Sequence, residues 1–212
     1  MNAGASWTVQ STSLSTYLCP SDGLARIESY GGATNYAGNQ GSGFQSFEYN
    51  GAFSHSNPVR FADITDGTSD TVAVSEWLTT RDTGFTRDSD RSVFHTSQRY
   101  LQKNELNKFI QLCESVDPKS AQIAPMMIGV RWTHGDFGHS LYNHVMPIQK
   151  SHCTNGGNHQ EGAWTAKSRH PGGVNSVMAD GHVVFFRSSI APSVWSGFGS
   201  RNGGEIVTVD TN

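Results

Sequence analysis

An Asp-Gly dipeptide between two β-prone runs is the feature that most constrains how this chain can fold. Residues 174–179 (VNSVMA) precede Asp180-Gly181, and residues 182–186 (HVVFF) follow it. Asp-Gly is a preferred two-residue hairpin connection, because both central residues of the turn need positive φ. The sequence therefore predicts an antiparallel hairpin in which β-branched and aromatic side chains pair across the two strands.

Composition supports a sheet-rich fold and excludes several function classes. The chain has 212 residues, which fits a single globular domain over residues 1–212. Glycine makes up 23 positions and charged residues only 16%, which argues against an all-helical protein. The net charge of −3 argues against nucleic-acid binding and against a polybasic membrane surface. We expect an α+β fold with an antiparallel sheet, few helices and long loops.

Other segments carry weaker local signals. Residues 59–64 and 71–77 predict a second hairpin, and residues 126–132, 162–166 and 205–209 predict further strands. Helical spacing of apolar residues from 97 to 116, ended by Pro118, predicts a helix, and residues 189–199 predict a shorter one. We expect an irregular lead-in over 1–23, loop with one short strand over 30–57, and an exposed insertion over 80–92.

Three cysteines leave three single-bridge pairings open, and none forms a C-x-x-C motif. Cys113 lies on the apolar stripe of the predicted helix, where a free thiol behaves as a small hydrophobic residue. Cys19 and Cys153 both lie in turn-forming sequence. If the protein is exported, we predict a Cys19–Cys153 disulfide.

Histidines and aspartates raise the question of metal binding. Five histidines fall within one stretch but lack zinc-motif spacing, which favours loop histidines that stack or hydrogen-bond: His134, His139, His144, His152 and His159. Two groups of aspartates do not match a calcium loop, so turn capping is favoured and calcium is the alternative: Asp63, Asp66 and Asp70, and Asp82, Asp88 and Asp90. We expect no metal or other cofactor. Nucleophile-elbow and nucleotide-binding motifs are absent, so we expect a protein that is not an enzyme.

Specific strings then add a family resemblance. His170, nine intervening residues and Asp180-Gly181 resemble the H-x9-D-G motif of bacterial prepilin-type, processing-associated proteins, whose C-terminal domain is otherwise of unknown function. Further strings agree in order: residues 18–22 (LCPSD), 35–39 (NYAGN), 61–71 (FADITDGTSDT), 142–147 (YNHVMP) and 201–205 (RNGGE). Pro147 is followed by Ile148-Gln149, where the family pattern has Pro-Pro-Asn.

The resemblance implies a structural protein similar to type IV pilins and pseudopilins of type II secretion, with residues 1–212 as a pilin-like antiparallel β-sheet head. Such proteins carry a short leader, a prepilin-type cleavage site and a long apolar helix that anchors them in the inner membrane. We expect that helix to precede Met1 in the parent protein, and an extracytoplasmic location in the periplasm or at the cell surface. The implied partners are other pilin-like subunits or the pilus or secretion assembly machinery. His170 is expected to be structural.

Two other functions remain open. Aromatic residues among Gly and Asn favour a module that binds a surface glycan or another extracellular ligand: Tyr30, Tyr36, Phe44, Phe47 and Tyr49. A metal-dependent hydrolase would use the stretch from His134 to His159. Bound metal in the isolated protein would favour the hydrolase, and a glycan-binding signal would favour the binding module.

Overall fold

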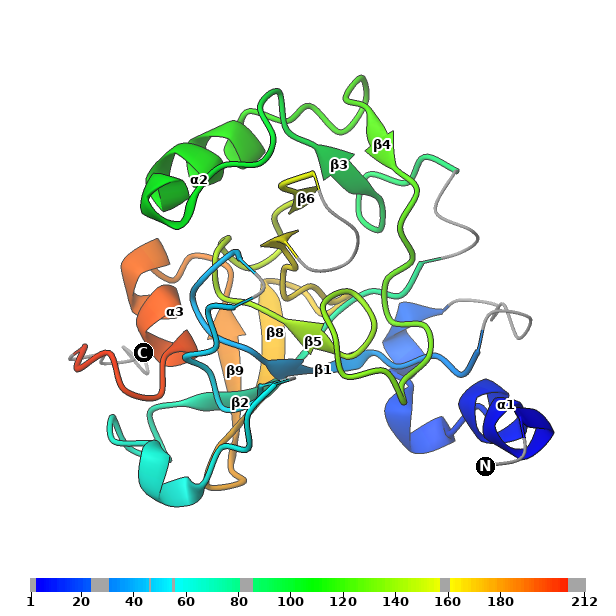
Figure 1. Ribbon diagram of the computed structural model, residues 1–212, viewed down its shortest axis with the longest axis horizontal. Coiled ribbons are helices and arrows are strands. Elements are labelled where there is room, and N and C mark those ends of the chain that lie inside the picture. Colours follow the sequence, from blue (N-terminus) through cyan, green and yellow to red (C-terminus); the bar gives the residue numbers. More distant parts are fainter. Residues whose placement is uncertain are drawn as a thin grey trace.

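The computed structural model describes residues 3–23, 31–45, 47–54, 56–80, 86–156 and 161–205. The fold is α+β and rich in sheet, as the composition predicts (Figure 1). Within these described ranges, nine strands form two sheets: β1 (Tyr36–Asn39), β2 (Val72–Glu76), β3 (Val93–His95), β4 (Ile123–Ala124), β5 (Leu141–Tyr142), β6 (His152–Thr154), β7 (Gly162–Ala163), β8 (Gly173–Met178) and β9 (Val183–Arg187). The α-helices are α1 (Ala3–Ser11), α2 (Leu106–Glu114) and α3 (Pro192–Gly199).

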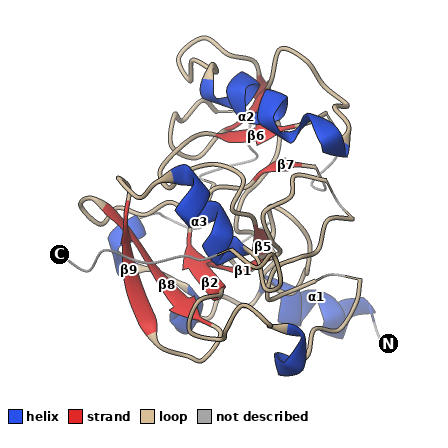
Figure 2. Cartoon of the chain, turned by 90° about the vertical axis from the view of Figure 1, so that its left-hand side faces the viewer, coloured by secondary structure: helices blue, strands red, loops and turns tan. Residues whose placement is uncertain are grey.

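Both sheets are mixed rather than wholly antiparallel. The larger sheet has the order β5-β1-β2-β8-β9, in which only the β1–β5 pair is parallel. The smaller sheet has the order β4-β3-β6-β7, with β3 and β6 parallel. Figure 2 shows α2 over the smaller sheet and α3 beside the larger one. In the described part of the chain, no helix is long and apolar enough to span a membrane.

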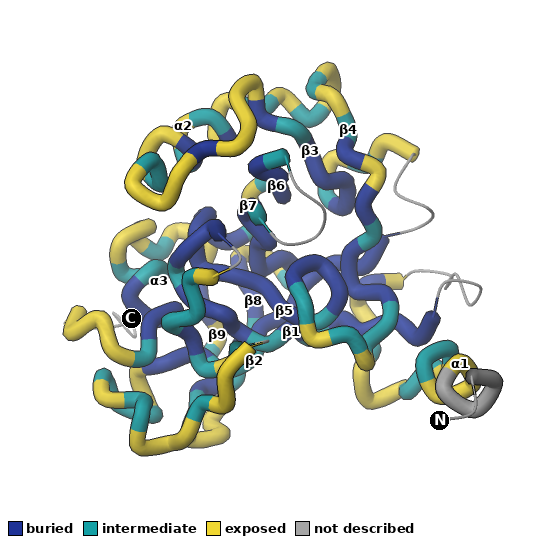
Figure 3. The backbone as a smooth tube through the Cα atoms, viewed as in Figure 1, coloured by how far each residue is buried: buried dark blue, intermediate teal, exposed yellow. Residues whose placement is uncertain are grey.

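Two clusters of buried side chains hold the sheets and helices together. Figure 3 shows the buried segments concentrated in the interior of the molecule. The first joins the larger sheet to α3, where Phe186 packs edge-to-face on Trp195 and Phe198 at 5.4 and 5.1 Å between ring centroids. The second lies under α2, where Phe44 stacks on Phe109 at 4.7 Å. Burying aromatic surface of this kind is the main stabilising contribution in such small cores.

The predicted hairpin is confirmed as β8 and β9, although its turn differs from the expected one. Five residue pairs register across it, from Gly173 with Arg187 to Val177 with Val183. The Gly181 N–H donates to the Met178 carbonyl at 2.9 Å, and Gly181 has φ 95°. Asp180 does not have positive φ. The connection is therefore a three-residue loop ending in a glycine, in which only one residue needs the left-handed region.

Several local predictions are wrong, and the two misplaced strands are wrong because tertiary contacts outweigh β propensity. Residues 59–64 contain a single 3₁₀ turn, Phe61–Asp63, instead of a strand paired with β2. Residues 126–132 contribute only an isolated bridge between Val130 and Ala33. The expected irregular lead-in begins with α1. The predicted strand at 205–209 lies largely outside the described residues, and so does part of the 80–92 insertion, whose Arg91 is buried.

The helix predicted over residues 97–116 is confirmed over a shorter span. Its position also shows that the predicted cysteine pairing is wrong. α2 runs from Leu106 to Glu114 and buries Phe109 and Cys113. Cys113 forms the disulfide with Cys153 on β6, with 5.9 Å between their Cα atoms, and Cys19 is free. The predicted Cys19–Cys153 bridge is therefore wrong. The apolar stripe of α2, on which Cys113 was expected to act as a small hydrophobic residue, faces β6 and so brings Cys113 to Cys153.

Candidate functional site

His170, the first residue of the H-x9-D-G string, sits in a tight turn just before β8. The Ser168 hydroxyl donates to the Gly173 carbonyl at 2.7 Å and accepts the His170 N–H at 3.0 Å. Gly172 has φ 85°, a conformation in which a side chain would be strained, so glycine suits this turn. The local sequence thus fixes the backbone that carries the imidazole.

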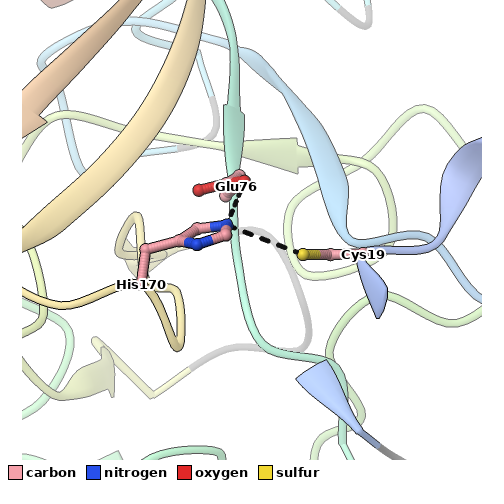
Figure 4. A group of neighbouring side chains, drawn as sticks. All are labelled: Cys19, Glu76 and His170. Atoms are coloured by element: carbon pink, nitrogen blue, oxygen red, sulfur yellow. Dashed lines mark hydrogen bonds and ion pairs between the residues drawn. The ribbon is translucent and has the colours of Figure 1, made fainter. Parts of the chain in front are cut away.

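The His170 ring meets a carboxylate and a thiol from two distant segments (Figure 4). Its Nε2 lies 3.2 Å from Glu76 Oε1, at the end of β2, and 3.8 Å from Cys19 Sγ. Glu76 is 4% exposed, while Cys19 and His170 are half-buried. Among the described residues, this trio is the one group of three or more such side chains close enough to hold a metal ion.

A buried polar network holds the segment that carries Cys19. The Cys19 N–H donates to Asn35 Oδ1 at 3.0 Å, and Asn35 Nδ2 donates to Asp22 Oδ2 at 2.7 Å. Asp22 pairs with Arg91 at 2.6 Å, with side chains 4% and 1% exposed. Pro20 begins a 3₁₀ turn that ends at Gly23 in the left-handed conformation. These contacts hold residues 18–22 (LCPSD), and with them the Cys19 thiol, in a fixed position.

Asn175 on β8 orients the Glu76 carboxylate. Its backbone N–H donates to Oε2 at 2.8 Å, and its side-chain Nδ2 lies 3.3 Å from Oε1. Sequence reasoning did not single out Glu76. The signal that could have found it is a charged residue inside the β-prone run 71–77, since a buried carboxylate needs specific partners.

The other two motif residues lie at the opposite end of β8, so the structure does not bring the whole motif together. Asp180 accepts hydrogen bonds from the His182 N–H at 3.1 Å and from its ring Nδ1 at 2.6 Å. These bonds hold the pKa of the Asp180 carboxyl below its usual value. Asp180 and Gly181 form the hairpin turn, which is a structural role.

The histidine-rich stretch is used for packing and hydrogen bonding. His144 stacks on Trp195 at 3.9 Å, its Nδ1–H donates to the Trp195 carbonyl at 2.7 Å, and the Tyr142 hydroxyl bonds Nε2 at 2.7 Å. His152 Nδ1 accepts the Thr165 N–H at 3.0 Å. The expectation of stacking and hydrogen-bonded histidines is confirmed for these two, while His159 lies outside the described residues.

Acid should destabilise the fold through these buried rings. Burial lowers the pKa of His144 to about 3, against the opposing effect of the Trp195 carbonyl, and also lowers that of His152. The unfolded chain binds protons that the folded chain does not, so stability is lost as pH falls from about 6.5 toward 3.

We predict that the H144Q variant loses about 2 kcal/mol less stability than wild type between pH 7 and pH 5, because one proton-linked site is removed. Urea unfolding at both pH values measures this difference. F61Q, which alters a side chain that is 74% exposed and carries no titratable group, should keep the wild-type pH dependence. An unchanged dependence in H144Q would contradict the assignment.

Asp63 and Asp88 accept backbone N–H groups of their own turns, as the sequence favoured, whereas Asp66 bonds a distant segment. Asp66 accepts the N–H groups of Gly203 at 2.7 Å and Gly204 at 3.1 Å, and Asp88 accepts the Asp90 N–H at 2.9 Å. Asp63 pairs with Arg60 at 2.8 Å. Asp82 lies outside the described residues. Their oxygens are directed at backbone and guanidinium donors.

An aromatic-lined pocket of about 600 Å³ opens beside β1, β2 and β5. Its lining includes Tyr17, Tyr36, Phe53 and Trp132, together with the hydroxyl-bearing residues Thr34, Ser54 and Ser140. Tyr36 lies opposite Glu76 in the β1–β2 pairing, so the pocket and the Cys19–Glu76–His170 trio share one face of the sheet.

Among the aromatic residues predicted to bind a ligand, only Tyr36 appears in this lining. Phe44 is buried in the core, Phe47 is exposed, and Tyr30 lies outside the described residues. The pocket aromatics Tyr17, Phe53 and Trp132 were not predicted, because loops far apart in sequence bring them together.

Comparison with known proteins identifies a family but not an activity. No curated protein and no solved structure matches the chain. Residues 1–193 match a family described as "Protein of unknown function (DUF1559)". Because that match covers most of the 212 residues, the chain belongs to this family of proteins of unknown function.

Proposed function

We propose that this chain is the head of an exported, non-enzymatic, pilin-like or pseudopilin-like protein that builds or decorates a surface filament. The ordered strings from residue 18 to residue 205 support this proposal through their resemblance to prepilin-type proteins. The observation that carries it in the structure is a row of apolar residues across one face of the larger sheet, exposed to solvent at β9.

That face can be followed strand by strand. Val177 lies opposite Val183 on β9 and opposite Val74 on β2, which in turn lies opposite Gly38 on β1. Paired residues project to the same side of a sheet, so these positions form one row. Val183 is 62% exposed and Phe185, two residues along β9, is 43% exposed. The helix α3 packs on the opposite face through Phe186.

A sheet with one packed face and exposed apolar residues on the other suits docking of an apolar helix, because an exposed row of this kind marks an interaction surface. In the proposed role, the occupant is the anchoring helix of the parent protein in the inner membrane or of a neighbouring pilin-like subunit. Pilus or secretion assembly machinery is the other proposed partner.

The disulfide supports the extracytoplasmic location. Cys113 and Cys153 are 1% and 0% exposed and closely paired. Structural disulfides persist in the periplasm and at the cell surface but are rare in reducing cytosol.

The assembly role predicts a strong effect of charge on the open face. In cells that make the parent protein, V183E/F185E should abolish its recovery in sheared surface fractions, because two buried carboxylates in an apolar interface are costly. The matched control is Y100E, since Tyr100 is 68% exposed near the smaller sheet.

Normal folding of the purified V183E/F185E domain, checked by circular dichroism, keeps the experiment interpretable. Equal surface recovery of both variants and wild type would contradict the proposed docking face.

The aromatic pocket favours one second candidate, an extracellular ligand-binding module. Tyr17 and Trp132 pack edge-to-face at 5.3 Å on its wall, and aromatic faces beside hydroxyls suit sugar stacking. Glycan-array binding that is lost in W132A would support this candidate, and a blank array would remove it.

A further inference from the structure

We propose that Cys19, Glu76 and His170 bind one zinc-class divalent ion, with a coordination position left open toward the aromatic-pocket face. This inference does not depend on the filament role. Thiolate, imidazole and carboxylate are the three side-chain ligands that zinc takes in proteins, and three protein ligands with an open position is a common zinc arrangement.

The spacing of the ligand atoms fits tetrahedral coordination. Metal–ligand distances of about 2.3 Å for sulfur and about 2.0–2.2 Å for nitrogen and oxygen place sulfur and nitrogen roughly 3.5 Å apart, and nitrogen and oxygen roughly 3.4 Å apart. The structure has Cys19 Sγ at 3.8 Å and Glu76 Oε1 at 3.2 Å from His170 Nε2, and all three atoms lie within 4.8 Å of one another.

The geometry favours metal binding over a nucleophilic relay, in which His170 would activate the Cys19 thiol and Glu76 would orient His170. In a relay, the nucleophile and the orienting carboxylate contact different nitrogens of the imidazole. Here Sγ and Oε1 both face Nε2. Three donors that converge on one region suit a shared cation, whereas a relay would leave Glu76 on the wrong side of the ring.

Supporting contacts fix each ligand, as a metal site requires. Asn175 donates to Glu76 from its backbone at 2.8 Å, Asn35 accepts the Cys19 N–H at 3.0 Å, and Ser168 accepts the His170 N–H at 3.0 Å. Glu76 is a buried carboxylate whose one ion-pair partner among the described side chains is His170. A cation would balance that charge.

The trio also borders the pocket. Tyr36 lies opposite Glu76 in the β1–β2 pairing, so the two side chains project to the same side of the sheet, and Tyr36 lines the pocket wall. The open coordination position thus borders the pocket. Because the disulfide uses the other two cysteines, Cys19 is the one thiol available as a ligand.

The test uses the purified chain with its disulfide intact and Zn²⁺ or Co²⁺ alone as the probe. We expect one ion per chain by elemental analysis after desalting, and a thiolate-to-cobalt charge-transfer band. Zn²⁺ should also protect Cys19 from iodoacetamide, and a chelator should restore its labelling.

Variants separate this site from adventitious binding. C19S should remove the cobalt band, and E76Q and H170N should each weaken Zn²⁺ binding at least tenfold in chelator competition. H182Q is the matched control, because His182 forms a similar histidine–carboxylate pair with Asp180, at 2.6 Å, without a thiol. Its affinity should equal that of wild type.

Metal-free melting curves show whether each variant still folds, and a metal-induced rise in melting temperature seen in wild type but not in C19S adds a second readout. Wild type with no stoichiometric ion, wild type with no thiolate band, or C19S with wild-type affinity would each overturn the proposal.

Discussion

Removal of the Cys113–Cys153 disulfide is expected to lower the free energy of unfolding by roughly 4 kcal/mol. The bridge closes a loop with a sequence separation of 40 residues, and a cross-link of that length restricts the unfolded chain strongly. It also ties α2 to β6 within the cluster that contains Phe44 and Phe109. Urea unfolding of the C113A/C153A variant against oxidised wild type measures the effect.

The third cysteine supplies the control for this experiment. C19A, studied without added metal, removes a thiol that is outside the bridge and should keep most of the wild-type stability. Reduced wild type should resemble C113A/C153A, because both lack the cross-link. If reduction left the unfolding midpoint unchanged, the bridge would not be a structural one.

Breaking the Asp22–Arg91 pair is the other large expected effect. R91M should lower the free energy of unfolding by about 3–5 kcal/mol, because it leaves a buried carboxylate without its counter-charge. Arg91 also donates to the Thr79 carbonyl at 2.7 Å, so the loss includes a backbone acceptor. Chemical denaturation at pH 7 measures the loss.

Two further variants define the cause of that loss. The double variant D22N/R91M should recover part of the stability, because the unpaired charge is gone. R60M breaks an ion pair whose side chains are 80% and 31% exposed, and should leave stability nearly unchanged. Equal losses of unfolding free energy in R91M and R60M would contradict the claim that burial makes the Asp22–Arg91 pair the more important one.

The Asp22–Arg91 pair also adds to acid sensitivity. Burial acts to raise the pKa of Asp22, but the bonds to Arg91 and Asn35 outweigh it and hold that pKa below its usual value. The folded chain therefore binds this proton less readily than the unfolded chain. The stabilising contribution is present above the usual aspartate pKa and is lost as pH falls through the folded value.

Local signals in the sequence predicted the elements whose pattern is self-contained. The Asp-Gly turn between residues 174–179 and 182–186 predicted β8 and β9, and the apolar spacing around Phe109 predicted α2. Residues 59–64 and 126–132 are equally β-prone but lack partner strands, so propensity alone misplaced them.

The candidate site could be predicted only in part, because its residues are far apart in sequence. Cys19 and His170 lie 151 positions apart, and both fall in strings that resemble one family. That resemblance marked the strings but not their contact. Glu76 had no motif to mark it, and only the pairing of β1, β2 and β8 brings it to His170.

The predicted Cys19–Cys153 pairing was wrong for a related reason. The turn-forming sequence around Cys19 and Cys153 led to their predicted pairing, whereas the packing of α2 against β6 brings Cys113 to Cys153. The leftover Cys19 then became available for a different role beside His170.

The measurement that tests the proposed exported location most directly is the thiol state of the protein in the cells that make it. Cells are quenched with acid, free thiols are alkylated, and the protein is mapped by mass spectrometry without reduction. An exported domain predicts a linked peptide pair containing Cys113 and Cys153, with the alkyl label on Cys19 alone. Alkylation of all three cysteines would show a reduced protein and would contradict the account.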